Sequence, residues 1–389
     1  MGSSMTGQPG LDVSIFDMII ETGDAQARLQ LVVELARLTC DGDAPESERA
    51  CVVPTLLKLA TDPVKDVRRV LAESLVSASD LHGDILFSII ADEDDIALPF
   101  LAATPALDPW KMRSIARVGD PPRQVTLAGR PDLTDDVIQE IATQADLSAC
   151  LALFDNADCT LAERNCRILY ARFGRVQEII DRLLALDTLP LEIRVMQAKR
   201  ASNQVHQLMA ERGWVPANDA ADMVADAEER AVLQILDSAN EVELAPLIRF
   251  MTSRNMLTAS IIMRSACAGN MRIVEVAMAH LANTTLPRAQ EALYGGASGF
   301  NSLYRGSGLP AGCIGLIRAV GQVERELRDA RRSLSVENFG RRLIEQVMTG
   351  DAAMAAAERA KYLDFIGRYS GERIRTIANR LREGLVTAA

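Results

Sequence analysis

A glycine-rich stretch between residues 294 and 308 has the residue types that come closest to a chemical site. Backbone amides between glycines, together with an arginine guanidinium, can hold a phosphate group. The spacing matches neither a phosphate-binding loop nor a dinucleotide fingerprint, and no strand pattern precedes the glycines. Two interpretations stay open. The glycines could end helices and let two helices cross closely, or they could bind an anionic nucleotide through these residues: Tyr294, Gly295, Gly296, Gly299 and Arg305.

Metal-binding and nucleophilic residues form no recognisable pattern. His82, His206 and His280 are far apart, and none has a second histidine or a cysteine at the spacing of a zinc site. The acidic run from Asp92 to Asp95 lacks the glycine and the late glutamate of an EF-hand loop. A Gly-x-Ser-x-Gly elbow is absent, so a Cys–His pair assembled by folding is the catalytic alternative left open. We expect no metal, no cofactor and no catalytic residue, and therefore a protein that is not an enzyme.

The charge of the chain argues against general binding to nucleic acid or to an anionic membrane surface. The net charge is −11 and the isoelectric point is near 5.0. Residues 1–160 contain 27 Asp and Glu against 12 Lys and Arg, a net charge of −15, and the remainder carries +4. The two oppositely charged parts could attract each other or select different partners.

Cysteine use and the absence of apolar runs favour a cytoplasmic protein. The seven cysteines are odd in number and contain no Cys-x-x-Cys pair, which is typical of reduced thiols in a core. No run of residues is long and apolar enough to span a membrane. Residues 1–10 lack the pattern of a secretory signal, and we expect them to form a flexible leader.

Four residue pairs recur at nearly fixed intervals and predict stacked repeats. The intervals are thirty, twenty-six and twenty-six residues, and we call the pairs the leucine ladder: Leu71-Ala72, Leu101-Ala102, Leu127-Ala128 and Leu153-Phe154. After each of the last three pairs comes a helix-starting residue, as in Asp108-Pro109 and in a capping box from Thr160 to Glu163. Each unit is a short helix, a turn and a second helix, too small to bury its apolar face alone. The pattern predicts a HEAT-like α-solenoid.

The second helices of these repeats would line a groove for a protein partner. Trp and Arg side chains are frequent energetic anchors of protein interfaces, although packing between repeats could equally explain the tryptophan. The exposed candidates are Trp110, Lys111, Arg113, Arg117, Gln139, Glu140, Arg164 and Arg167.

Longer helices follow once the repeat period ends near residue 173. No stretch alternates apolar and polar residues as a strand would, and aromatic residues make up only 4% of the chain, so we expect an all-α protein. A linker over 213–225 would separate a repeat domain (11–212) from a C-terminal helical domain (226–389). Residues 320–334 have coiled-coil spacing over barely two heptads, which indicates an internal packing seam or a homodimer contact.

Several stretches together resemble the DUF2336 family of alphaproteobacterial proteins. They are the run from Val67 to Leu75, the segment from Asp95 to Leu101, the turn from Gly129 to Thr134, and a later part with Gly299 to Arg305. The resemblance extends from about residue 25 to 330. It implies a HEAT-like helical fold and a bacterial cytoplasmic setting, and it supplies no catalytic residues. We expect an adaptor or scaffold in bacterial regulation or signalling, with nucleotide sensing as the alternative.

Overall fold

The computed structural model describes residues 13–40, 45–212, 216–330, 335–349, 355–370 and 372–387. Within these ranges the secondary structure consists of 23 α-helices and one short 3-10 helix, with no strand, which confirms the all-α prediction. None of the described helices is long and apolar enough to cross a membrane. The predicted leader, residues 1–10, lies outside the described residues. The chain divides into two compact units, an N-terminal unit (Met1–Leu189) and a C-terminal unit (Pro190–Ala389).

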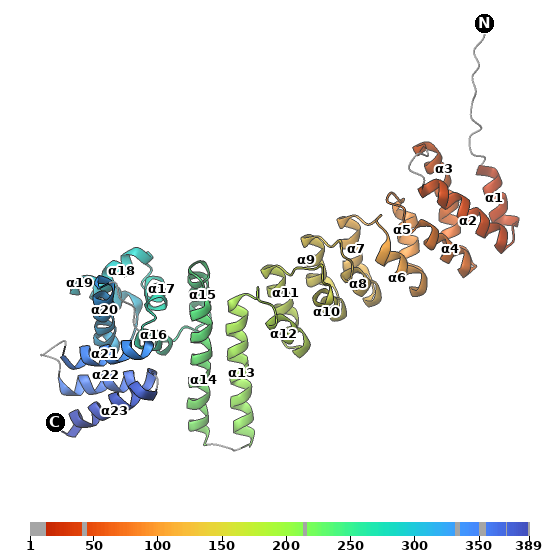
Figure 1. The fold of residues 1–389 in the computed structure, drawn as a ribbon. Helices are drawn as coiled ribbons and strands as arrows, with labels where there is room; N and C mark the ends of the chain where they lie inside the picture. Colours follow the sequence, from red (N-terminus) through yellow and green to blue (C-terminus); the bar gives the residue numbers. More distant parts are fainter. Residues whose placement is uncertain are drawn as a thin grey trace, which may run out of the picture. The chain divides into compact units, whose positions relative to one another are not determined.

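The N-terminal unit is built from short helices in pairs (Figure 1). Its described helices are α1 (Val13–Thr22), α2 (Ala25–Cys40), α3 (Glu46–Ala60), α4 (Lys65–Leu75), α5 (Gly83–Ile90), α6 (Asp94–Ala103), α7 (Pro109–Val118), α8 (Pro121–Ala128), α9 (Asp135–Gln144), α10 (Leu147–Asp155), α11 (Glu163–Phe173) and α12 (Gln177–Leu184).

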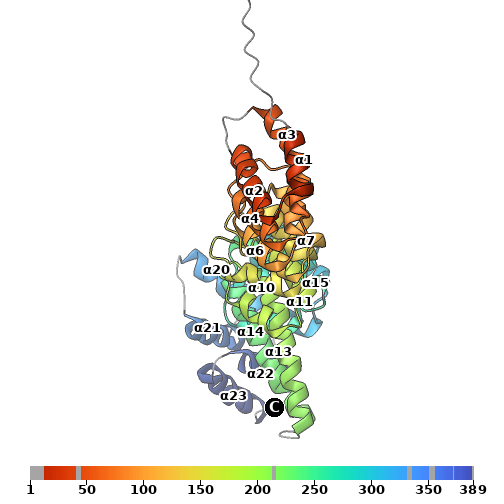
Figure 2. The same ribbon diagram turned by 90° about the vertical axis from the view of Figure 1, so that its right-hand side faces the viewer.

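These helices stack in two layers. In one layer α2 contacts α4, α4 contacts α6, α6 contacts α8, and α8 contacts α10. In the other layer α7 contacts α9 and α9 contacts α11. Figure 2 looks nearly along this stack, so that helices of successive repeats lie behind one another. This arrangement agrees with the predicted helical repeats.

The leucine ladder marks the buried side of the first layer. Leu71, Leu101 and Leu127 are fully shielded from solvent, and Leu153 is 1% exposed. They lie on α4, α6, α8 and α10, one in each repeat. Burial of a leucine side chain contributes roughly 1.5–3 kcal/mol. The period in the sequence is therefore the period of the core.

The helix starts agree with the sequence in one repeat and differ in another. Asp108 caps α7, and its Oδ1 accepts a hydrogen bond from the Lys111 amide (2.9 Å), as predicted. The capping box at Thr160 is wrong, because α11 begins at Glu163 and its N-cap is Ala162. The backbone runs two further residues in non-helical conformation before the helix begins.

Side chains join the ends of helices across repeats by donating to backbone carbonyls. Arg130 donates from Nη2 to the Thr104 carbonyl (2.9 Å) and from Nη1 to the Leu101 carbonyl (2.5 Å). Asn156 donates from Nδ2 to the carbonyls of Arg130 (2.7 Å) and Ala128 (2.8 Å). Each side chain thus binds the backbone of the residue that lies 26 positions earlier. We call these contacts the inter-repeat carbonyl bonds.

Two more arginines make equivalent bonds at other helix ends. Arg172 on α11 donates to the carbonyls of Ala142 (2.6 Å) and Ala145 (2.7 Å) at the end of α9. Arg123 on α8 donates from Nε to the carbonyl of Ile90 (2.5 Å), the last residue of α5. The last four carbonyls of an α-helix have no partner within the helix. In this unit a later repeat supplies the missing donors.

The C-terminal unit contains longer helices around a buried central one. Its described helices are α13 (Leu191–Arg212), α14 (Ala217–Ser238), α15 (Glu241–Ser253), α16 (Ala259–Cys267), α17 (Met271–Leu281), α18 (Leu286–Tyr294), α19 (Ala297–Ser307), η1 (Ala311–Cys313), α20 (Ile314–Asp329), α21 (Val336–Thr349), α22 (Ala356–Tyr369) and α23 (Glu372–Thr387). All residues of α16 from Ile261 to Cys267 are buried, and α16 contacts α14, α17, α20, α21 and α22.

Two expectations for this region have structural answers. We expected a linker over 213–225, but α14 already begins at Ala217 and packs against α13, and the two compact units divide after Leu189. Residues 320–334 were expected to form either an internal packing seam or a homodimer contact. Val320 and Val323 are fully buried in the core of the C-terminal unit, as an internal seam requires.

We predict that Arg130→Met destabilises the N-terminal unit. Arg130 is 4% exposed, and its loss leaves two buried carbonyls without donors, which costs about 2–4 kcal/mol. The measurement is urea denaturation of the full chain followed by circular dichroism. Arg164→Met is the matched control, because Arg164 is exposed and lies no closer than 3.7 Å to a carboxylate, so it should change stability by less than about 0.5 kcal/mol. Equal effects of the two variants would contradict this role of Arg130.

Candidate functional site

An arginine pair bridges two adjacent repeats on the second layer. Arg117 on α7 donates from Nε and Nη2 to the two carboxylate oxygens of Glu140 on α9, at 2.7 and 2.9 Å. Arg113, one turn earlier, lies 3.5 Å from the same carboxylate. The bond from Arg117 lowers the pKa of Glu140 and outweighs the opposing effect of burial. Glu140 is therefore ionised at neutral pH and fixed between two guanidinium groups.

A polar groove of about 360 Å³ runs between α7 and α9 beside this bridge. It contains four of the predicted partner-binding residues, and its lining consists of Arg113, Arg117, Asp136, Gln139, Glu140, Thr143 and Gln144. All of these side chains are polar or charged. The groove can offer both donors and acceptors to a bound segment.

Trp110 stands in solvent near the start of α7. The Asp108 cap and Pro109 fix the first turn of this helix, and Trp110 is 67% exposed. Lys111, the next residue, folds back so that Nζ donates to the Ala106 carbonyl (3.0 Å). Packing between repeats therefore does not account for Trp110, whereas Lys111 is engaged with its own loop.

The remaining two predicted partner-binding residues lie on α11. Arg164 is 3.7 Å from Asp135 and 3.9 Å from Asp136, both on α9. Arg167 pairs with Glu163 of its own helix at 2.7 Å. All eight predicted residues thus belong to α7, α9 and α11, consecutive helices of one layer. We call this surface the α7–α11 face.

The glycine-rich stretch forms a helix junction with little free space. Gly295 and Gly296 connect α18 to α19, and Gly299 packs α19 against Ala292 of α18. The hollow at this junction measures about 100 Å³, far below the roughly 300–1,000 Å³ of small-molecule pockets. Arg305 is exposed near the opposite end of α19, so it does not meet the glycines.

Tyr294 takes part in a buried polar cluster. Glu275 is 4% exposed and accepts hydrogen bonds from the Tyr294 hydroxyl, from Gln290 (2.7 Å) and from Arg328 (2.6 Å). Burial and the bond to Glu275 raise the pKa of Tyr294. The guanidinium of Arg328 also lies 4.3 Å from the centre of the Tyr294 ring. These contacts explain Tyr294 as part of the packing of α17, α18 and α20.

Residues 96–357 match the model of a family described as an uncharacterised protein conserved in bacteria. The match covers more than half of the chain, from α6 to the start of α22. The chain belongs to the DUF2336 family. The comparison with curated proteins gives no match. The resemblance expected from about residue 25 to 330 is thus confirmed at the level of the family, and the match lies further toward the C-terminus.

The cysteines of this DUF2336 protein are unpaired, and four of the seven are buried. Burial raises the pKa of Cys150 and Cys166 to about 11, and that of Cys267 to about 12. These thiols stay protonated at neutral pH. Cys40 and Cys51 are exposed, which differs from the expected core position. Across the described parts of the chain, no group of three or more His, Cys, Asp or Glu side chains could hold a metal ion.

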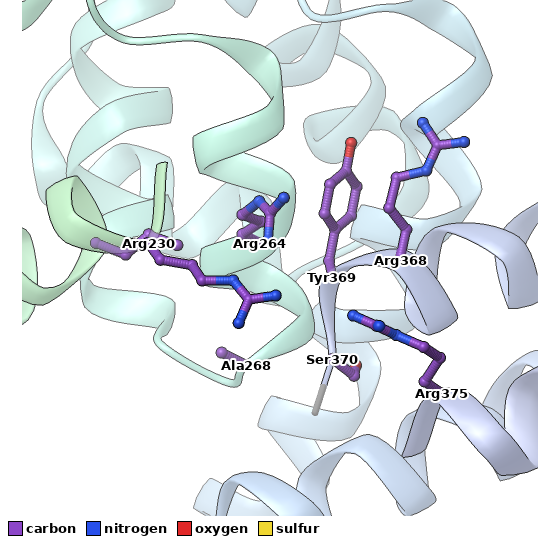
Figure 3. Close-up of a pocket in the computed structure, with 8 residues that line it drawn as sticks. Arg230, Arg264, Ala268, Arg368, Tyr369, Ser370 and Arg375 are labelled. Atoms are coloured by element: carbon purple, nitrogen blue, oxygen red, sulfur yellow. The ribbon is translucent and has the colours of Figure 1, made fainter. Parts of the chain in front are cut away.

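A second group of arginines lies in the C-terminal unit, and the sequence analysis did not predict it. They line a hollow of about 540 Å³, which we call the arginine hollow (Figure 3). Its lining residues are Arg230, Leu233, Arg264, Ala268, Arg368, Tyr369, Ser370 and Arg375. These residues lie on or next to α14, α16, α22 and α23. Four of them lie after residue 357, where the family match ends: Arg368, Tyr369, Ser370 and Arg375. No short motif in the sequence could have linked residues spread over this distance.

The bridge between Arg117 and Glu140 predicts a pH-dependent contribution to stability. A carboxylate whose pKa is lowered in the folded state stabilises the fold above its unfolded pKa of about 4.3 and loses that effect as the pH falls through the lower folded pKa. Arg117→Met should therefore lower stability at neutral pH and have little effect once Glu140 is protonated in acid. Urea denaturation of both proteins over a pH series measures this difference. A constant difference across the series would contradict it.

Proposed function

We propose that this DUF2336 protein is a non-enzymatic scaffold that binds a protein partner along the α7–α11 face. The observation that carries the proposal is Trp110, a large aromatic side chain that is 67% exposed on a helix whose arginines form the adjacent polar groove. Tryptophan and arginine are the residue types that most often dominate binding energy at protein interfaces. We place this scaffold in the bacterial cytoplasm, in regulation or signalling.

The stacked repeats support a binding role for this face. Repeat arrays present extended surfaces to which each repeat adds one pair of helices. The bridge from Arg117 to Glu140 holds side chains of two repeats in fixed positions before any partner arrives. A fixed side chain loses less conformational entropy on binding than a mobile one.

The charge of the N-terminal part favours a partner with a basic surface. Residues 1–160 carry a net charge of −15. Charge of one sign steers an oppositely charged partner during encounter, and salt screens this attraction over about 10 Å at 0.1 M. The association rate should therefore fall as the salt concentration rises.

We predict that Trp110→Ala and Arg113→Glu each weaken partner binding by at least about tenfold. The tagged full chain and its variants are used to capture proteins from native lysate, and the partner recovered in equal amount is purified for titration against each variant. Val242→Ala is the matched control, because Val242 is 83% exposed on α15 in the other unit, and it should bind like the unaltered protein.

Two results would overturn the proposal. If the unaltered chain captures no protein in stoichiometric amount from the lysate, the proposal that it binds a protein partner is contradicted. A partner that binds the Trp110 and Arg113 variants as tightly as the unaltered chain would place its site elsewhere than on the α7–α11 face.

A further inference from the structure

Arg264 is a fixed positive charge at the wall of the arginine hollow. Its residue is 7% exposed, Nε donates to Glu229 (2.6 Å), and Nη2 donates to Asp226. Its guanidinium carbon lies 4.9 Å from the centre of the Tyr369 ring. Two carboxylates and an aromatic face thus hold this side chain in one position.

Arg230 and Arg375 reach into the hollow with most of their donors available. Figure 3 shows the two side chains extending toward each other from opposite walls, whereas the guanidinium of Arg368 points away from them. Arg230 pairs with Asp226 at 2.8 Å, and Arg375 donates from Nε to the Gly367 carbonyl (3.0 Å). Within the described ranges no carboxylate lies within ion-pair distance of Arg375. A guanidinium has five N–H donors, so both groups can bind a further acceptor.

Among the described side chains, the carboxylates bonded to the arginines of the hollow are fewer than those arginines. Four arginines line it, and the described carboxylates bonded to them are Asp226, Glu229 and Asp364. Asp364 is shared with a fifth arginine, Arg382 of α23. Positive charge that exceeds its counter-charges in a partly enclosed hollow attracts anions.

The hydroxyl of Ser370 is a polar group without a partner. Its Oγ is shielded from solvent and has no hydrogen-bond partner among the described residues. Nearly all buried polar groups in proteins are hydrogen-bonded, so an exception calls for an explanation. Ser370 lines the hollow together with Arg375, but its Oγ is turned away from solvent and therefore from an anion in the hollow.

Stabilisation of helix ends explains only some of these residues. Arg264 and Arg368 lie in the last turns of α16 and α22, where a positive charge interacts favourably with the helix dipole. Arg375 donates to a carbonyl near the end of α22. Ser370 is the C-cap of α22, and its backbone N–H donates to the Ile366 carbonyl (2.9 Å). Arg230 lies within α14, more than one turn from either end, so a helix end does not explain it.

We propose that the arginine hollow binds the phosphate group of a small phosphorylated molecule through Arg230 and Arg375, beside the fixed Arg264. The planar guanidinium forms paired hydrogen bonds to phosphate oxygens. The volume of about 540 Å³ lies within the range of small-molecule pockets, and Leu233 and Ala268 give an apolar wall for the rest of the molecule. This site does not depend on the proposed scaffold function.

Isothermal titration of the full chain tests the proposal with inorganic phosphate and with adenosine 5′-monophosphate, at constant ionic strength set by chloride. Binding at one site per chain is expected for at least one of the two probes. Tighter binding of the nucleotide would identify a phosphomonoester as the ligand class, and tighter binding of inorganic phosphate would identify the free anion. Binding of neither probe would overturn the proposal.

Variants assign the binding to the hollow. Arg230→Gln and Arg375→Gln should each weaken binding by at least about tenfold, because each removes a charge-assisted hydrogen bond. Ser370→Ala should leave the affinity unchanged, because Oγ of Ser370 is shielded from solvent. Arg305→Gln is the control, because Arg305 is exposed and outside the hollow, and it should bind like the unaltered chain.

Thermal melting without ligand separates binding from structure. The Arg230 variant should melt like the unaltered chain, because its side chain is exposed and pairs only at the surface. Unchanged phosphate affinity in both arginine variants would overturn the proposal. A lower melting temperature for Arg375→Gln in that case would mean that Arg375 serves the end of α22 alone.

Discussion

The carbonyl groups at the ends of very short helices are the constraint on which the N-terminal unit depends. Several of its helices have only eight to eleven residues, so four unpaired carbonyls are a large share of each helix. Arg130, Asn156 and Arg172 supply donors to these carbonyls from a later repeat. A repeat is therefore incomplete in its hydrogen bonding as well as in its apolar core, and both deficits are met by the neighbouring repeat.

The architecture could be predicted from the sequence because burial has the same period as the chain. Leu101 and Leu127 occupy equivalent core positions, so their spacing gives the repeat length directly. The bounds of α13 were also predictable, since its pattern begins after a proline and continues without a break to Arg212. Part of the linker expected at 213–225 is helix instead, because the alanine-rich segment from Ala217 favours helix and packs on α13; residues 213–215 lie outside the described residues.

The candidate sites differ in how far the sequence could reveal them. The residues of the α7–α11 face could be predicted, because the repeat period determines which residues of the second helices point outward together. The arginine hollow was not, because Arg230, Arg264 and Arg375 come from three helices and share no motif. The glycine-rich stretch had the composition of an anion site, yet α19 carries Arg305 away from the glycines. The arginines of the hollow come together only when their helices pack against one another. The sequence of the C-terminal unit has no repeat period from which this packing could be predicted.

Arg130 and Asn156 occupy equivalent positions in successive repeats, and this restricts the insertions and deletions that the N-terminal unit can accept. Each donates to the backbone of the residue that occupies its own place in the preceding repeat, at a separation of 26 residues. Insertion or deletion of one whole repeat would keep the separation of 26 residues between donor and carbonyl. An insertion or deletion of a few residues inside a repeat would move Arg130 away from the carbonyls that it binds. Evolution of the N-terminal unit is thus expected to proceed in complete repeats, with shorter insertions confined to the turns.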